Sequence, residues 1–390
     1  MSYTTPVVSY SATLNGTYTA LTGIQSAIIT RGRQRFQDPT QPLTLSLELI
    51  PANSYALPLA RGQFIDVRAT SSNTSDGYFQ GQIIEVKRQY AIPYNSGTGA
   101  APGDRITIEA VGSIGQLSAN IFTNYNFANQ LTFNALGTAV GNAGVRFNGV
   151  QNDFNRISAQ TYNGSSFDLM NDCMRQLQYE AFEIDQNRTD VDVRLRAGFS
   201  PTGFQWSAPI TFSDAGTPGA YKYSDIEYLT SVRDSFTQVN VEAAGLATQS
   251  AQIGVAPFNP LQYQTFNETT AAALDLATYV LTLNSNNALT PFMIATDTTF
   301  DPTVVALARM PSVNDTFYPN ITSGGTYKSI IGAPVEITFR GSTVLAALKG
   351  TSIAFYPDRA SVALYFSPFE YAFQLDSATL GVLDQNRLGL

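Results

Sequence analysis

The segment from Leu43 to Leu49 constrains the fold of this chain more than any other. Leucine occupies every second position of it, and Thr44, Ser46 and Glu48 occupy the positions between. This period of two is typical of a β-strand with one buried and one open face. Ile106, Ile108 and Ala110 repeat the alternation, and turn-rich stretches such as residues 95–103 (NSGTGAAPG) separate such segments. Short strands at this spacing predict a barrel or a sandwich.

The pattern divides the 390 residues into three parts. We expect an N-terminal β-barrel at 1–115, an α+β insert at 116–225 with a helix at 165–180 and a hairpin at 182–196, and a second β-barrel region at 226–390 with a helix at 268–283. Ser165 and Asp168 have the spacing of a capping box before the first helix. The prediction is a mainly β protein with a small α+β part, in which the two flanking β regions are a diverged pair of related barrels.

The composition excludes several classes of chemistry. There is no histidine, which removes the commonest general base and any catalytic triad built on it. Cys173 is the only cysteine, so no intrachain disulfide and no cysteine-rich zinc site can form. The net charge of -8 argues against a general nucleic-acid binder. We expect a soluble, non-catalytic protein that needs neither cofactor nor metal.

No stretch of 18 apolar residues occurs, so we expect no stable membrane insertion. Residues 1–6 (MSYTTP) have neither the basic nor the apolar region of a secretory signal peptide.

The densest basic cluster is Arg31-Gly32-Arg33-Gln34-Arg35. Its arginines either contact phosphates or an acidic partner, or pair with nearby carboxylates such as Asp38 and Glu48. Three arginines in an acidic chain are too few for a nucleic-acid footprint. Arg31, Arg33 and Arg35 are therefore candidates for contacts between subunits.

Other candidates are weaker. Asp185 and Asn187 suggest a calcium loop, but Asp190 and Arg196 stand where an EF-hand requires glycine and glutamate. Cys173 has no histidine to activate it and lies on an apolar helical stripe, so it is expected in a core. The 20 tyrosines and 24 phenylalanines form either a sugar-stacking surface or, as we favour, the core and a subunit interface.

Several segments, in this order, carry a family resemblance: residues 28–36 (IITRGRQRF), 61–68 (RGQFIDVR), 78–90, 105–117 (RITIEAVGSIGQL), 223–244 and 373–390. Together they resemble the minor tail or tail-hub proteins of long-tailed bacteriophages, relatives of the central hub protein of contractile-tail baseplates.

The resemblance implies two tail-tube-like β-barrel domains plus accessory α+β domains. It also implies a homotrimer whose six barrels form a ring around the channel for the genome at the tail tip of the virion, assembled in the host cytoplasm. Such a ring joins the sixfold tail tube or a distal tail ring above to a threefold tip or fibre protein below. An acidic, sparsely charged lumen would repel DNA rather than bind it.

Two alternatives stay open. A β-rich receptor- or glycan-binding protein would expose a cluster of aromatic side chains. A glycan hydrolase would need two carboxylates about 5 to 10 Å apart, and the 30 acidic residues offer too many pairs to name one.

Overall fold

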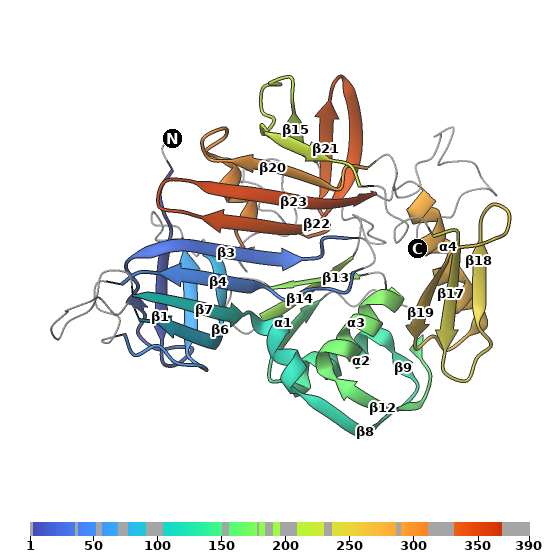
Figure 1. Cartoon of the computed structure of the whole chain (residues 1–390). Helices are drawn as coiled ribbons and strands as arrows, with labels where there is room; N and C mark the ends of the chain where they lie inside the picture. Colours follow the sequence, from blue (N-terminus) through green and yellow to red (C-terminus); the bar gives the residue numbers. More distant parts are fainter. Residues whose placement is uncertain are drawn as a thin grey trace, which may run out of the picture.

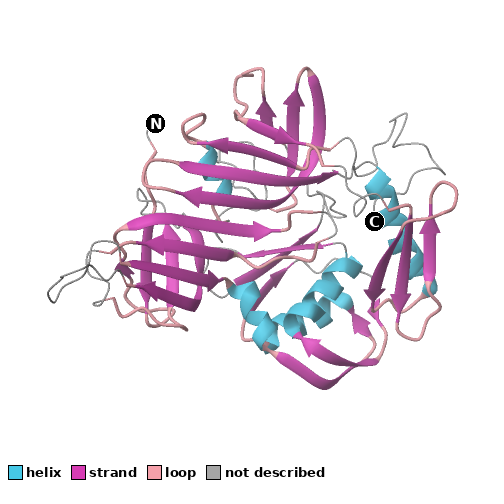
Figure 2. Ribbon diagram, in the orientation of Figure 1, coloured by secondary structure: helices cyan, strands magenta, loops and turns pink. Residues whose placement is uncertain are grey.

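The structure is a computed structural model, and it describes residues 3–35, 38–51, 57–68, 77–90, 104–149, 156–177, 179–183, 190–195, 209–229, 236–285, 290–310 and 331–368. Strands dominate it (Figure 2), as the sequence predicts for a mainly β protein. A 13-stranded sheet runs through the molecule, and two smaller α+β units lie beside it (Figure 1).

The N-terminal strands confirm the predicted alternation. They are β1 (Val7–Ser11), β2 (Thr19–Ala20), β3 (Ile24–Gly32), β4 (Thr44–Leu49), β5 (Phe64–Arg68), β6 (Gly77–Gln89) and β7 (Arg105–Val111). Leu45, Leu47 and Leu49 of β4 are fully buried, while the residues between them are half-exposed. The order in the sheet is β3-β4-β7-β6-β5-β1-β2. β2 lies at the far end of this order and connects through a short turn to β3 at its start. This part of the sheet therefore curls back on itself.

The C-terminal strands repeat that order. They are β15 (Ile210–Ser213), β16 (Asp225–Glu227), β20 (Met293–Asp297), β21 (Pro334–Phe339), β22 (Ser342–Phe355) and β23 (Ala360–Pro368). Their order is β16-β20-β23-β22-β21-β15, so β3, β4, β7, β6, β5 and β1 correspond to them one by one, also along the chain. A bridge from Phe212 to Tyr221 leads back toward β16, as β2 leads back to β3.

Details of the pairing support the repeat. The long strands β6 and β22 both carry a bulge, between Ile83 and Glu85 and between Leu348 and Gly350. One ladder differs, since β1 pairs with β5 antiparallel and β15 pairs with β21 in parallel. In neither region do the ladders of the described residues close into a barrel, because the return passes through a turn or a single bridge. The two β regions are therefore related, as predicted, but curled rather than closed.

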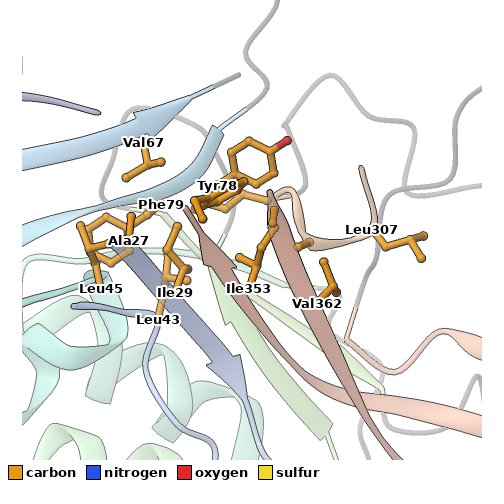
Figure 3. Packing of buried hydrophobic residues seen from close by; sticks show 14 of the residues in the cluster. Ala27, Ile29, Leu43, Leu45, Val67, Tyr78, Phe79, Leu307, Ile353 and Val362 are labelled. Carbon is orange, nitrogen blue, oxygen red and sulfur yellow. The ribbon is translucent and has the colours of Figure 1, made fainter. Parts of the chain in front are cut away.

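A ladder between β3 and β22 joins the two regions into one sheet. It pairs Ile29 with Ile353 and Arg31 with Thr351. Behind it lies one apolar core with members from both regions, among them Leu45, Phe79 and Val362 (Figure 3). The domain boundaries at 115 and 225 stay a prediction.

The first α+β unit follows β7. Its helices are α1 (Ser113–Gln116), α2 (Thr132–Asn142) and α3 (Ser166–Leu177), with a short 3-10 turn at Leu117–Ala119. Its strands are β8 (Ile121–Phe127), β9 (Gln130–Leu131), β10 (Arg146–Gly149), β11 (Arg156–Ile157), β12 (Gln160–Ser165), β13 (Tyr179–Glu183) and β14 (Asp190–Leu195). The unit has a core of its own around α2 and α3.

The predicted capping box begins α3. The Asp168 backbone N–H donates to Ser165 Oγ at 3.0 Å, and the Ser165 N–H donates to the Asp168 carboxylate at 3.4 Å. The stripe of Leu169, Cys173 and Leu177 is buried, as expected. β13 and β14 pair antiparallel, as the hairpin prediction requires, and the turn between them lies outside the described residues.

A second small unit is inserted between β16 and β20. It contains β17 (Gln238–Ala243), β18 (Gln249–Gln252), β19 (Pro260–Thr265) and α4 (Thr270–Ser285), close to the helix expected at 268–283. α4 covers this sheet and shares a third core with it. A 3-10 helix at Val304–Ala308 packs against the main core. The C-terminal segment of the resemblance, 373–390, lies outside the described residues.

We expect Leu47→Ala to lower the free energy of unfolding by about 2–5 kcal/mol, because it leaves a cavity in a close-packed core. Leu47 is 0% exposed and pairs with both Ala27 and Ile108. Urea unfolding measures the change. Ser26→Ala, half-exposed on the other face of the sheet, is the matched control, and an equal loss in both variants would contradict the assignment of faces.

Candidate functional site

The structure places two of the three candidate arginines inside the chain. Arg31 is 7% and Arg33 4% exposed. Arg31 Nε donates to Thr351 Oγ1 at 3.0 Å, across the ladder that joins the two β regions. Arg33 donates to the Asp38 carbonyl oxygen at 2.9 Å and to the Thr40 hydroxyl at 3.1 Å.

Arg35 is half-buried, and its backbone N–H donates to the Asp38 carboxylate at 3.0 Å. Asp38 is thus a partner of this segment, as one of the two interpretations predicted. Glu48 pairs instead with Arg105 at 2.9 Å. Each of the three arginines thus has partners within its own chain. A contact between subunits stays a prediction for all three.

A buried carboxylate lies near Arg31. Glu183, the last residue of β13, is 6% exposed and lines a small cavity with Arg31, Leu43, Ile114, Phe182 and Met310. The Ile114 N–H donates to its Oε1 at 2.6 Å. Gly112 packs so tightly against the same carboxylate that a Cβ there would collide with it. Glu183 therefore attaches the first α+β unit to the turn that follows β7.

Burial dominates the electrostatics of this site. It raises the pKa of Glu183 to about 8, although the Ile114 and Leu43 amides and the charge of Arg31 act in the opposite direction. Burial also lowers the pKa of Arg31 to about 10, so Arg31 remains charged at neutral pH. Sequence reasoning missed Glu183, since its partners come from distant segments.

The main sheet has a second face, opposite its core. It runs without interruption over eight strands in the order β16-β20-β23-β22-β3-β4-β7-β6, all antiparallel. One row across it, from β23 to β7, contains Ser361, Ala354, Ile28, Ser46 and Glu109, and Glu85 of β6 ends it. Small and hydroxyl side chains prevail, and most are half-exposed. We call this surface the polar sheet face.

The polar sheet face is acidic. Its carboxylates outnumber its cations, with Glu48, Glu85, Glu109, Asp225, Glu227 and Asp297 against Lys87 and Arg105. Glu85 and Glu109 lie directly opposite each other on neighbouring strands. Like charges in such a pair destabilise a sheet, and the Ser46 hydroxyl, which donates to Glu109 at 2.7 Å, offsets part of the repulsion. We expect this pair to lower the stability of the sheet.

The structure brings together aromatic rings that look scattered in the sequence. Phe122, Tyr125, Phe127 and Tyr162 form a cluster with centroid distances of 4.8 to 6.4 Å. Phe122 and Phe127 are buried, so most of this cluster belongs to the core of the first α+β unit rather than to a flat sugar-stacking platform.

Within the described ranges, no group of three or more Cys, Asp or Glu side chains could hold a metal ion. The possible calcium ligands Asp185 and Asn187 lie outside those ranges. Cys173 is fully buried in the core of α2 and α3. No helix of the described part is long and apolar enough to cross a membrane.

No protein-family model matches the chain, and no curated protein matches it. Solved structures do. The prophage MuSo2 43 kDa tail protein from Shewanella oneidensis is 12% identical with a TM-score of 0.59, over 93% of this chain and 98% of that one. The tail protein from Neisseria meningitidis MC58 is 11% identical with a TM-score of 0.60, over 94% and 97%. The chain thus has the fold of phage tail proteins.

We expect Glu183→Gln to flatten the dependence of stability on pH. Because the pKa of Glu183 is raised on folding, the folded state binds its proton more tightly than the unfolded state does. Its contribution to stability is therefore full below pH 4.5 and is lost as the pH rises to about 8. Thermal unfolding between pH 5 and 8.5 measures this loss, with Glu242→Gln, whose side chain is exposed, as control. An unchanged slope in Glu183→Gln would contradict the assignment.

We expect Glu85→Gln to raise the free energy of unfolding by about 0.2–1 kcal/mol, because it removes the repulsion of Glu109 across the ladder. Glu85→Lys should raise it further, since it places an opposite charge there. Urea unfolding at low salt measures the series, and high salt should reduce the differences. A loss of stability in both variants would show that the two carboxylates do not repel each other.

Proposed function

We propose that the protein is a structural component of a phage tail that acts by assembly, without catalysis. In this proposal three copies form a hub ring at the tail tip, which joins the tail tube or a distal tail ring to the tip or fibre protein. The ring surrounds the channel through which the genome passes. The fold shared with two tail proteins over nearly their whole length supports this class of function.

The polar sheet face is the observation that carries the proposal. A continuous eight-stranded surface is wide enough to form a wall, and a soluble monomer has no need for a wall with opposed carboxylates. Phosphates passing such a wall are repelled, and its neutral hydroxyl and methyl groups offer no cationic binding sites. We propose that this face lines the channel.

In this proposal, surfaces other than the polar sheet face contact protein partners. The first α+β unit and the unit of β17, β18, β19 and α4 both lie to one side of the main sheet (Figure 1), where they can contact the rings above or below. Arg35, half-buried at the end of the arginine segment, is the member of the predicted contact set that is most accessible to a neighbouring subunit.

Electron microscopy of the purified protein tests the proposal. We expect threefold rings with an open channel wide enough for duplex DNA and with the polar sheet face toward the channel. Particles that remain monomers at high concentration, also with the other tail proteins added, would contradict it.

We further expect that rings carrying Glu85→Lys and Glu109→Lys bind DNA, with an affinity that falls steeply with salt, because cations then line the wall. Wild-type rings should not bind measurably. A matched variant with Glu242→Lys and Glu268→Lys has the same net charge but alters other parts of the chain. A gel-shift titration compares them, and equal binding by both variants would show that the polar sheet face does not line the channel.

A further inference from the structure

The ladder between β22 and β3 joins the two β regions of one chain. The internal repeat places an equivalent position at each outer edge of the sheet, where no further strand is described. The long strand β22 pairs with β21 through residues 342–347 and with β3 through residues 350–355. Its equivalent β6 pairs with β5 through residues 77–82, but beyond Ile83 that side of β6 has no ladder in the described part of the chain. At the other end of the sheet, β16 likewise pairs only with β20 among the described strands. Among the described strands, the sheet therefore ends in two edges without a further ladder, at β6 beyond Ile83 and at β16.

The repeat assigns a position in the inner contact to each edge residue. Glu85 follows the bulge of β6 as Gly350 follows that of β22, so Gln89 corresponds to Ala354 and Tyr90 to Phe355. Through the ladders of β4 and β20, Glu227 of β16 corresponds to Ile28 of β3 in the same way. Tyr228 then corresponds to Ile29.

The exposed fraction of the corresponding side chains differs between the inner contact and the two sheet edges. In the inner contact, Phe355 and Ile29 are each 2% exposed. Their counterparts at the open edges, Tyr90 and Tyr228, are 45% and 46% exposed. Tyrosine is favoured at interfaces because it provides a large apolar area with a polar end that tolerates water before assembly.

Strand direction and charge complete the match. Eight antiparallel strands leave β16 and β6 pointing in opposite directions, so a ladder between them continues the antiparallel pattern. On the polar sheet face, the β6 edge carries Lys87 beside Glu85, and the β16 edge carries Asp225 and Glu227. Arg88 lies on the opposite face, where it donates to the Leu57 and Leu59 carbonyl oxygens. Because the two edges differ, they join copies head to tail, and such contacts form a ring when the rotation from copy to copy closes.

We propose that β6 of one copy pairs with β16 of the next in the register of the inner β22–β3 ladder. Ala354 lies opposite Ile28 in that ladder, so Gln89 lies opposite Glu227 of the next copy. Lys87 is then the diagonal neighbour of Glu227 on the polar sheet face, within reach of its carboxylate. This register extends the proposed function, on which it rests, by naming the residues that join the ring.

Cross-linking of single-cysteine variants tests the register. Gln89→Cys protein and Glu227→Cys protein are purified separately, mixed and treated with a short bis-maleimide, since directly opposed side chains have Cβ atoms about 4.5–5.5 Å apart. Native Cys173 is fully buried and is shielded from the reagent. We expect covalent dimers in the mixture and not in either variant alone. Gln89→Cys mixed with Ser250→Cys, on exposed β18, is the matched control and should give none.

Imaging the same samples separates the two proposals. Rings together with the specific cross-link support the register. Rings without the cross-link, or with equal cross-linking to the Ser250→Cys control, overturn the register and leave the proposed function standing. If neither rings nor cross-links form, both proposals are overturned.

Charge reversal gives a second measurement on the same contact. We expect Lys87→Glu to reduce the fraction of protein in rings about tenfold, and Lys87→Glu with Glu227→Lys to restore most of it, because the exchange re-forms the pair. Val255→Asp, at the most exposed apolar side chain of the unit that contains β18, is the control for added negative charge. Rings unaffected by Lys87→Glu would overturn the placement of Lys87.

Discussion

The ladder between β3 and β22 is the contact on which the rest of the structure depends. It joins residues more than 300 positions apart, as the bond from Arg31 to Thr351 shows, and it converts two curled β regions into one sheet with one core. Closing a loop of that length costs conformational entropy, and long-range pairing of this kind slows folding. Once formed, it fixes which side of the sheet is buried and therefore which side is left to face solvent or other molecules.

The sequence predicts the parts of this molecule that depend on local patterns. The leucine alternation of β4, the capping box at Ser165 and the stripe that buries Cys173 all follow from spacing alone, and the structure has them. Register does not follow from spacing, because a strand that alternates fits several neighbours equally well. The opposition of Glu85 and Glu109 and the burial of Glu183 were thus beyond sequence reasoning, as was the burial of Arg31 and Arg33.

A sheet with two different faces resolves an apparent conflict in the composition. Half of each strand serves the apolar core, so only the alternate positions are free to carry function. Those positions contain serine, threonine, alanine and carboxylates, which explains why a chain with few charges still presents an acidic surface. A surface that must let a polyanion pass needs repulsion without binding sites, and small neutral side chains with scattered carboxylates provide both.

The repeat also explains why the inner contact and the open edges differ in chemistry although they share a geometry. The inner contact does not separate in a folded chain. It can therefore consist of side chains that are never exposed to water, such as Ile29, Phe355 and a buried arginine. An edge that pairs only on assembly is exposed to water beforehand, and an exposed apolar edge strand promotes aggregation. In the proposed ring, Tyr90 and Tyr228 tolerate water before assembly, and the opposite charges of Lys87 and Glu227 select one partner edge over the other. In the proposed ring, the same contact is permanent within the chain and conditional between copies.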